Sequence, residues 1–152
     1  MLISDLLAPS GALCALEGGS KKRILEIASQ QIAELHPELE AEAIFTGLIN
    51  RERLGSTGIG EGVAIPHCRL DECQQATALL IQLNEPIDFD AIDSNPVDLL
   101  FILLVPSEAC DQHLQTLGTL AELFSQAAFR NRLRDAETAQ ALYTAATEFR
   151  PS

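Results

Sequence analysis

Apolar residues recur at helical spacing in the first third of the chain. After Ser20 they return every three or four residues, which predicts an amphipathic helix that Ser20 caps and Pro37 ends. The apolar positions are Ile24, Leu25, Ala28, Ile32 and Leu35. A second pattern of the same period predicts a helix from about Glu40 to Arg53, with Gly55 at its C-terminal end. We therefore expect helices in the N-terminal part of the chain.

The middle of the chain changes to short, continuous apolar runs, which are typical of buried strands. Two such runs cover residues 77–83 and 97–105. A turn and a short alternating strand are expected between them, over residues 84–90. Another short strand is predicted over residues 63–67, with Pro66 at its end or edge because proline cannot donate to a ladder.

Helical spacing returns after Pro106, and Ser107 is the expected N-cap of a helix that runs to about Phe124. Its predicted inward stripe is Leu114, Leu117, Ala121 and Phe124, with Leu120 beside it and His113 on its face or edge. Two further helices are expected, over 127–134 and after Asp135, the last with Ala139, Leu142, Tyr143 and Ala146 inward. Helices at both ends and strands between them predict a single-domain α/β sandwich over residues 1–152. Its mixed β-sheet would be covered by helices on both faces.

Composition and charge narrow the class of protein. The length of 152 residues suits one domain, and 47% apolar with 21% charged residues is typical of a globular chain. A net charge of −12 argues against a nucleic-acid partner and against binding to an anionic membrane surface. No apolar run approaches the ~20 residues of a membrane span, and the N-terminus lacks the basic region of a secretory signal. Four scattered cysteines are typical of reduced thiols, so we expect a cytoplasmic protein without membrane insertion.

The most unusual segment is the glycine-rich run GSTGIGEG, residues 55–62, which leads towards His67. Four of the nine glycines lie in it, which predicts a loop with positive φ angles and close approach of the backbone. Two nucleotide-binding patterns do not fit this run. A Walker loop requires a lysine that is missing here, and a Rossmann fingerprint follows a strand, whereas this run follows a predicted helix.

Histidine occurs at three positions: His36, His67 and His113. His36 stands at a helix end, where a solvated histidine is favoured by the helix dipole. His67 follows a proline at the end of a predicted strand, where its ring can be held rigidly and still reach solvent. A neutral imidazole nitrogen is a competent nucleophile, and a phosphoryl group also needs cationic or N–H partners. The nearest such groups in sequence are Arg51, Arg53 and the loop amides.

Two other chemistries are conceivable from the cysteines near His67. A metal could be held by His67, Cys68, Cys73 and His113, but adjacent residues of a strand point to opposite sides and the cysteine spacing is loose. Cys68 could also be a nucleophile activated by His113. A small buried core residue is the more typical role of such a cysteine, so both readings are disfavoured.

Three ordered blocks of the chain resemble a known family. They are RERLGSTGIGEGVAIPH (residues 51–67), PIDFDAID followed by PVDLLFILLVP (residues 86–106), and HLQTL followed by LAELF (residues 113–124). The first block resembles the phosphorylation-site signature of the IIA proteins of the phosphoenolpyruvate-dependent phosphotransferase system, in the fructose/mannitol superfamily. The other two blocks agree with it. The loop sequence GSTGIG favours the nitrogen-regulatory branch. The resemblance covers nearly the whole of residues 1–152.

The resemblance implies which residues form the site. His67 matches the histidine that accepts a phosphoryl group, on its Nε2 atom. His113 matches a second histidine near it that stabilises the phosphoryl group, and Arg51 matches an arginine that stabilises the phosphorylated form. Four residues of the glycine-rich loop are candidates of lower weight: Ser56, Gly58, Gly60 and Glu61. For Glu61, bonding to backbone N–H groups is an equally good reading. No cofactor or metal on this chain is implied.

The resemblance also implies a phosphocarrier and regulator in the nitrogen branch of the system. It would accept a phosphoryl group from an HPr-like phosphocarrier (NPr) and regulate partners, such as potassium-transport or sensor proteins, according to its phosphorylation state. Such a protein is itself the phosphohistidine intermediate, which leaves open whether it counts as an enzyme. Two alternatives are a sugar-transport IIA component that passes phosphate to a fructose- or mannitol-type IIB domain, and an interaction module that works without phosphorylation.

The basic residues are unevenly placed along this acidic chain. Residues 70–129 contain ten acidic residues and no lysine or arginine, whereas Arg51, Arg53 and Arg69 all lie close to His67 in sequence. An acidic protein that holds a phosphoryl group must place positive charge where that anion binds. The distribution therefore predicts that Arg51 lies beside His67 in the fold.

Overall fold

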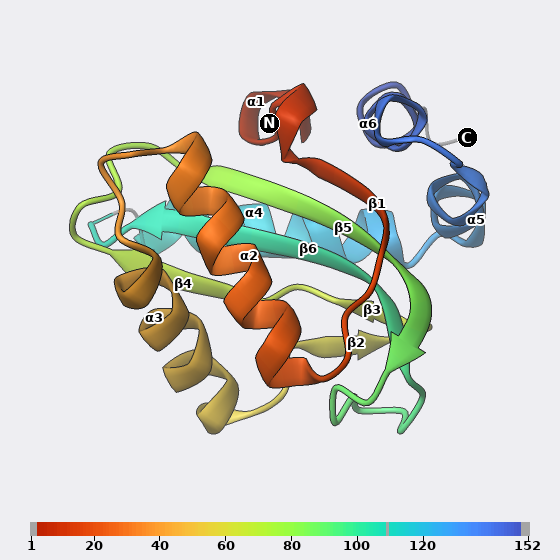
Figure 1. The fold of residues 1–152 in the computed structure, drawn as a ribbon, viewed down its shortest axis with the longest axis horizontal. Helices are drawn as coiled ribbons and strands as arrows, with labels where there is room; N and C mark the ends of the chain where they lie inside the picture. Colours follow the sequence, from red (N-terminus) through yellow and green to blue (C-terminus); the bar gives the residue numbers. More distant parts are fainter. Residues whose placement is uncertain (1–2, 109, 150–152) are drawn as a thin grey trace.

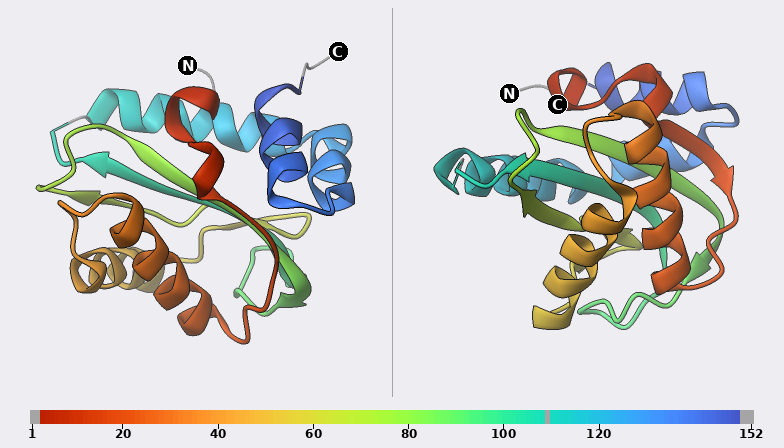
Figure 2. Two further views of the ribbon diagram at one scale, coloured as in Figure 1. Left: turned by 45° about the horizontal axis from the view of Figure 1, so that its top comes forward. Right: turned by 60° about the vertical axis from the view of Figure 1, so that its left-hand side comes forward.

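The structure is a computed structural model that describes residues 3–108 and 110–149. Six strands of the described chain form one sheet, shown edge-on in the left view of Figure 2. They are β1 (Ala12–Leu16), β2 (Gly58–Gly60), β3 (Val63–Ala64), β4 (His67–Leu70), β5 (Thr77–Ile87) and β6 (Val97–Pro106). The helices are α1 (Ile3–Leu6), η1 (Pro9–Gly11), α2 (Lys21–Leu35), α3 (Ala41–Leu54), α4 (Cys110–Phe124), α5 (Ala127–Asp135) and α6 (Ala139–Thr147).

The sheet is mixed, as predicted. Its strand order is β1-β5-β6-β3-β2, and β4 also pairs with β6, further along the same edge as β3 (Figure 1). The central pair β5–β6 is antiparallel, while β1 runs parallel to β5, and β3 and β4 run parallel to β6. Strand β2 closes an antiparallel hairpin with β3. The glycine-rich run therefore lies at the β2–β3 edge of the sheet.

Helices cover both faces of the sheet, which confirms the predicted sandwich. Helices α2 and α3 pack on one face, and α1, α4, α5 and α6 lie on the other (Figures 1 and 2). Side chains of β5 alternate between the two cores, with Leu79 and Ile81 on the α2–α3 side and Leu80 on the other. Because both faces of β5 and β6 are buried, their sequences are continuous apolar runs instead of alternating ones.

The two predicted N-terminal helices are confirmed. The Ser20 side chain accepts a hydrogen bond from the Arg23 backbone N–H at 3.1 Å, as an N-cap residue should. Helix α2 ends at Leu35, two residues before Pro37, and α3 ends at Leu54, directly before Gly55. Strand β1, which precedes these helices, was not expected. Its five residues are too short an apolar run to distinguish from a loop, and pairing with β5 defines it.

The segment between the two long strands differs from the prediction of a turn and a separate short strand over 84–90. Strand β5 continues through Pro86 to Ile87, with a shift of register between Gln82 and Ile87. Pairing with β1 stops at Leu83, so beyond it β5 is an edge strand and tolerates a proline. The strand predicted over 63–67 is also divided, because Pro66 interrupts it. His67 therefore begins β4 instead of ending a strand.

Helix α4 begins at Cys110, so the predicted N-cap at Ser107 is wrong. The Ser107 hydroxyl instead donates to Asp71 Oδ1 at 2.7 Å. The predicted inward stripe is confirmed for Phe124, and Leu117 and Ala121 are half-buried, but the prediction is wrong for Leu114. Leu114 is 65% exposed, whereas the buried positions are His113, Thr116, Leu120 and Phe124. The apolar pattern selects Leu114 and misses Thr116 because it does not register a polar side chain that faces inward.

Helices α5 and α6 agree with the prediction. Phe129 and Leu133 of α5 and Leu142 and Ala146 of α6 are buried, although Ala139 is exposed. None of the described helices is long and apolar enough to cross a membrane.

Candidate functional site

The candidate site lies where β4 begins, between α3 and α4. Strand β4 pairs with β6, and the backbone N–H of Leu103 in β6 donates to the Pro66 carbonyl at 2.9 Å. His67, the next residue, is thereby held at a fixed point of the sheet edge, and its side chain remains half-buried. Helix α3 supplies Arg51 to this point, and α4 supplies His113.

The hydrogen bonds of His67 assign its tautomer. Arg51 Nε lies 3.3 Å from His67 Nε2, and His67 Nδ1 lies 2.8 Å from the Ile65 carbonyl oxygen. A guanidinium can only donate and a carbonyl can only accept. The Nδ1 atom therefore carries the proton, and the lone pair of the unprotonated Nε2 accepts the Nε–H of Arg51. This is the protonation state that a nucleophilic Nε2 requires.

Two effects lower the pKa of His67 from its ordinary value of 6.5. Burial has the larger effect, and the positive charge of Arg51 adds to it. The hydrogen bond to the Ile65 carbonyl and the negative charge of Glu52 act in the opposite direction, but the net pKa is lowered. His67 is therefore neutral near pH 7.

This lowered pKa predicts how His67 responds to pH. We expect the pKa of its ring to lie below the ordinary value of 6.5, so that Nε2 is unprotonated at pH 7 and gains a proton only at a more acidic pH. A titration followed by NMR of the ring carbons and nitrogens measures this directly. A histidine model peptide, with a pKa of ~6.5, is the control. Titration of His67 at a higher pH than the peptide would contradict the described environment.

His113 is the second imidazole of the site. Its ring centroid lies 5.4 Å from that of His67, with the ring planes tilted by 53°, and the residue is only 6% exposed. Burial lowers its pKa, and the positive charges of a protonated His67 ring and of Arg69 lower it further. The site thus contains two neutral imidazoles in contact, and the Nδ1 atom of His113 has no hydrogen-bond partner among the described residues.

The predicted concentration of positive charge is confirmed for Arg51. Its Nη1 atom donates to the Gly55 carbonyl at 2.9 Å, which anchors the guanidinium while Nε faces His67. Arg69, on β4, acts on His113 through its charge. Arg53 does not join them: it is exposed and donates to Asn50 on its own helix.

The candidate residues of the glycine-rich loop contact another segment. The Ser56 hydroxyl donates to the Phe89 carbonyl at 2.7 Å and accepts from the Gly58 N–H. The Glu61 N–H donates to Asp93 at 2.9 Å, so the expectation that Glu61 itself binds backbone N–H groups has no counterpart in its described contacts. These amides are engaged within the loop and with residues 89–93. A direct role of Ser56, Gly58, Gly60 or Glu61 in phosphoryl transfer stays a prediction.

At two positions of the loop, the backbone conformation or a close neighbour requires glycine. A Cβ atom at Gly58 would lie 2.7 Å from the Ala91 side chain, so the close approach of these segments requires glycine. Gly60 has φ +99°, in the region that side chains disfavour. Both observations confirm the predicted close approach and positive φ.

The disfavoured cysteine chemistries have no support in the structure. Burial raises the pKa of the Cys68 thiol to about 12, so it stays protonated and is a poor nucleophile. Its side chain belongs to the core between the sheet and the α2–α3 layer. Among the described residues, no three histidine, cysteine or acidic side chains are grouped closely enough to hold a metal ion.

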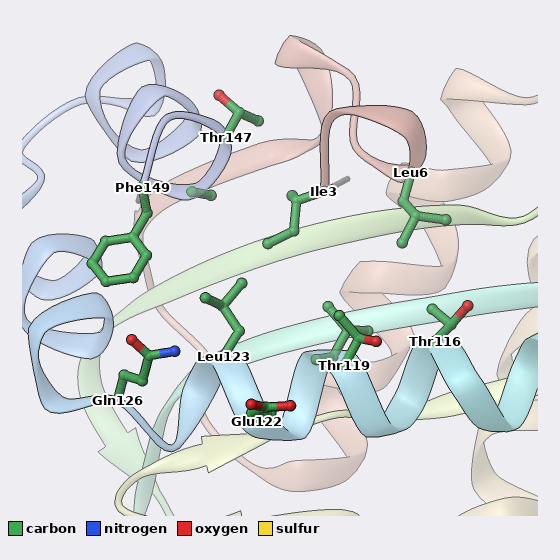
Figure 3. A pocket seen from close by; sticks show the side chains of 11 residues that line it. Ile3, Leu6, Thr116, Thr119, Glu122, Leu123, Gln126, Thr147 and Phe149 are labelled. Atoms are coloured by element: carbon green, nitrogen blue, oxygen red, sulfur yellow. The ribbon is translucent and has the colours of Figure 1, made fainter. Parts of the chain in front are cut away.

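A separate cavity of about 290 Å³ lies between α1, α4 and the C-terminal part of the described chain (Figure 3). Its walls are mainly apolar, with Ile3, Leu6, Leu123 and Phe149 pointing into it, and Thr119 at its edge. No histidine is among the residues that line it. The groups capable of phosphoryl chemistry therefore gather at β4 and not in this cavity.

Sequence reasoning missed a buried acid beside the site. Glu52 follows Arg51, is 8% exposed, and contacts Lys21 of α2 and Thr57 of the loop. A signal for it exists in the sequence. Glu52 continues the inward period of Ile44 and Leu48, so a charged residue occupies a core position of α3.

Comparison with known proteins defines the class. The family "Phosphoenolpyruvate-dependent sugar phosphotransferase system, EIIA 2" matches residues 7–148. The chain belongs to this family of IIA proteins. A structure of mannitol IIA from Escherichia coli shares the fold, with a TM-score of 0.75 at 16% identity over 91% of this chain and 97% of that one.

Closer relatives define the branch. A nitrogen regulatory protein of Pseudomonas aeruginosa is 49% identical over 141 residues, which cover 93% of this chain and 92% of the relative. The crystal structure of the nitrogen regulatory protein IIA-Ntr from Neisseria meningitidis superimposes with a TM-score of 0.88 at 42% identity, covering 95% of this chain and 99% of that one. Within the IIA superfamily, the chain is thus a protein of the nitrogen regulatory, or IIA-Ntr, family.

Proposed function

We propose that this protein is a phosphocarrier and regulator of the nitrogen branch of the phosphotransferase system. The observation that carries the proposal is the unprotonated Nε2 atom of His67, which faces the guanidinium of Arg51 at 3.3 Å and has the His113 ring beside it. The donor is an HPr-like phosphocarrier (NPr) that presents a phosphohistidine. Membership of the IIA-Ntr family supports this choice of donor over a sugar-specific route.

The transfer needs one bond to form and one to break. The Nε2 lone pair of His67 attacks phosphorus in line, while the phosphorus–nitrogen bond of the donor breaks and its electron pair returns to the donor imidazole. The His67 Nδ1 proton stays on the ring, bonded to the Ile65 carbonyl. Positioning and charge stabilisation account for most of the catalysis in such transfers. Arg51 and His113 supply them, and the step requires no cofactor on this chain.

Phosphorylation would change the character of the surface around His67. It adds roughly −1.5 to −2 charge next to exposed apolar side chains. Leu54, which is 85% exposed, lies one turn after Arg51, and Leu114, which is 65% exposed, follows His113. The carrier docks on these apolar residues. Cytoplasmic regulatory partners, such as potassium-transport or sensor proteins, bind one charge state and reject the other.

The test is phosphorylation of the wild-type protein. Incubation with phosphoenolpyruvate, the first enzyme of the system and the HPr-like carrier is expected to place one acid-labile, base-stable phosphoryl group on Nε2 of His67. Phosphorus NMR identifies the bond, and mass spectrometry of peptides under alkaline conditions locates it. Omission of the carrier is the control. A stable phosphoester, or a label on another residue, would contradict the proposal.

A further inference from the structure

Glu52 is a buried carboxylate with a complete set of partners. Its side chain is 4% exposed, and its Oε1 atom lies 3.0 Å from Lys21 Nζ and accepts the Thr57 backbone N–H at 3.2 Å. The Thr57 hydroxyl donates to Oε2. An isolated buried carboxylate would be strongly destabilising, so these contacts are required for its presence in the fold.

A hydrogen-bonded path leads from this carboxylate to the candidate nucleophile. Glu52 accepts hydrogen bonds from both the N–H and the hydroxyl of Thr57, and the Thr57 carbonyl bonds the segment that follows β3. That carbonyl accepts the Ile65 N–H at 3.0 Å, and the Ile65 carbonyl in turn accepts the Nδ1 proton of His67 at 2.8 Å. Glu52 is thus connected, through the backbone of Thr57 and Ile65, to the acceptor of the His67 proton.

Lys21, at the start of α2, connects Glu52 to the segment after β5. Its ammonium group donates to the Phe89 carbonyl at 3.4 Å and lies 4.7 Å from the centre of the Phe89 ring. The Ser56 hydroxyl donates to the same carbonyl. The start of α2, the end of α3 and the segment after β5 therefore meet at Glu52, which limits movement of the loop that contains Thr57.

We infer that Glu52 and Thr57 are positioning residues for the phosphoryl acceptor. They hold the Ile65 carbonyl at the Nδ1 atom of His67, and this keeps Nε2 as the unprotonated nitrogen that faces Arg51. Neither residue touches the phosphoryl group, and both act through the backbone of Ile65. The inference deepens the proposed function and rests on it, because positioning of Nε2 matters only if His67 is the acceptor.

The experiment compares four variants in the phosphorylation assay with the HPr-like carrier. Thr57→Val removes the hydroxyl and preserves the shape of the side chain. Thr57→Ser keeps the hydroxyl and removes only the methyl group, and Glu52→Gln removes the negative charge. Glu26→Gln is the matched control, since Glu26 lies on α2, pairs with Arg23 and has a side chain that is 42% exposed. The readouts are the single-turnover rate at saturating and subsaturating carrier, and the nitrogen NMR pattern that distinguishes the two tautomers of His67.

We expect Thr57→Val and Glu52→Gln to lower the transfer rate at saturating carrier roughly 10- to 100-fold, because a small displacement of a reacting group has effects of this size. The dependence on carrier concentration should stay unchanged, and a detectable part of His67 should shift to the Nε2–H tautomer. Thr57→Ser and Glu26→Gln should resemble the wild type in both readouts.

Two negative outcomes are distinguishable. If the wild type is phosphorylated on His67 but Thr57→Val keeps both its rate and its tautomer, the positioning role is overturned while the proposed function stands. If the wild type is not phosphorylated on His67, the proposed function itself fails. Should Glu52→Gln fail to fold, as judged by circular dichroism, the isosteric Thr57→Val and its serine counterpart decide the question.

Discussion

A His67→Ala variant is expected to accept no measurable phosphoryl group from the HPr-like carrier, a loss of several orders of magnitude in rate. The variant removes the Nε2 lone pair that forms the new bond, and loss of a nucleophile is among the largest effects a substitution can have. The buried neighbour His113 cannot replace it. His113 is only 6% exposed, so a docked carrier has little access to its ring. Rapid-quench phosphorylation with alkaline electrophoresis measures the result.

The matched control for this prediction is His36→Ala. His36 follows the last residue of α2 and shares a hydrogen bond with Thr77 at 3.0 Å, away from the contacts of Arg51. This variant should be phosphorylated at the wild-type rate. Full phosphorylation of His67→Ala would show that another residue is the acceptor, and the proposed function would then be wrong.

Arg51→Gln is expected to reduce the rate of phosphoryl transfer about 10²- to 10³-fold while the fold remains intact. The guanidinium faces Nε2, where the phosphoryl group would be attached, so it stabilises negative charge in the transition state and in the product. Arg51→Lys should recover part of the rate, since lysine keeps the charge but not the planar set of donors. Because the charge of Arg51 lowers the pKa of His67, the pKa should rise in Arg51→Gln.

Arg53→Gln is the control for this second prediction. Arg53 lies in the same helical turn, is exposed and donates only to Asn50 among its described partners, so the variant loses the same charge without loss at the site. Its transfer rate and the pKa of His67 should match the wild type. Equal losses in both variants would mean that the overall charge of the helix end, and not the contact with His67, is responsible.

Much of the fold could be predicted because its signals are local. The cap at Ser20, the stop before Pro37 and the apolar runs of β5 and β6 each depend on a few neighbouring residues, and all of them are confirmed. The missed elements depend on partners far away in sequence. Strand β1 has only five residues, and β5 defines it by pairing with it.

The buried face of α4 shows the same limit in a functional element. Its inward positions His113 and Thr116 are polar, whereas the apolar pattern predicts that Leu114 faces inward, and Leu114 is exposed. Burial of His113 is compatible with a site, since it places an imidazole against His67. The spacing of hydrophobic residues is therefore a poor guide to burial where a polar residue of the candidate site is itself buried.

By itself, the sequence determined the class of the protein. The motif from Arg51 to His67, the glycines that permit a tight loop, and the apolar central strands specify an α/β IIA protein. Only the tertiary structure decided the geometry that makes His67 a nucleophile. The tautomer depends on Arg51 and Ile65, and the burial of Glu52 depends on Lys21. The contacts of Arg51 with His67 and of Lys21 with Glu52 join side chains from different elements, and their distances follow from how the helices pack, which no local pattern of residues encodes.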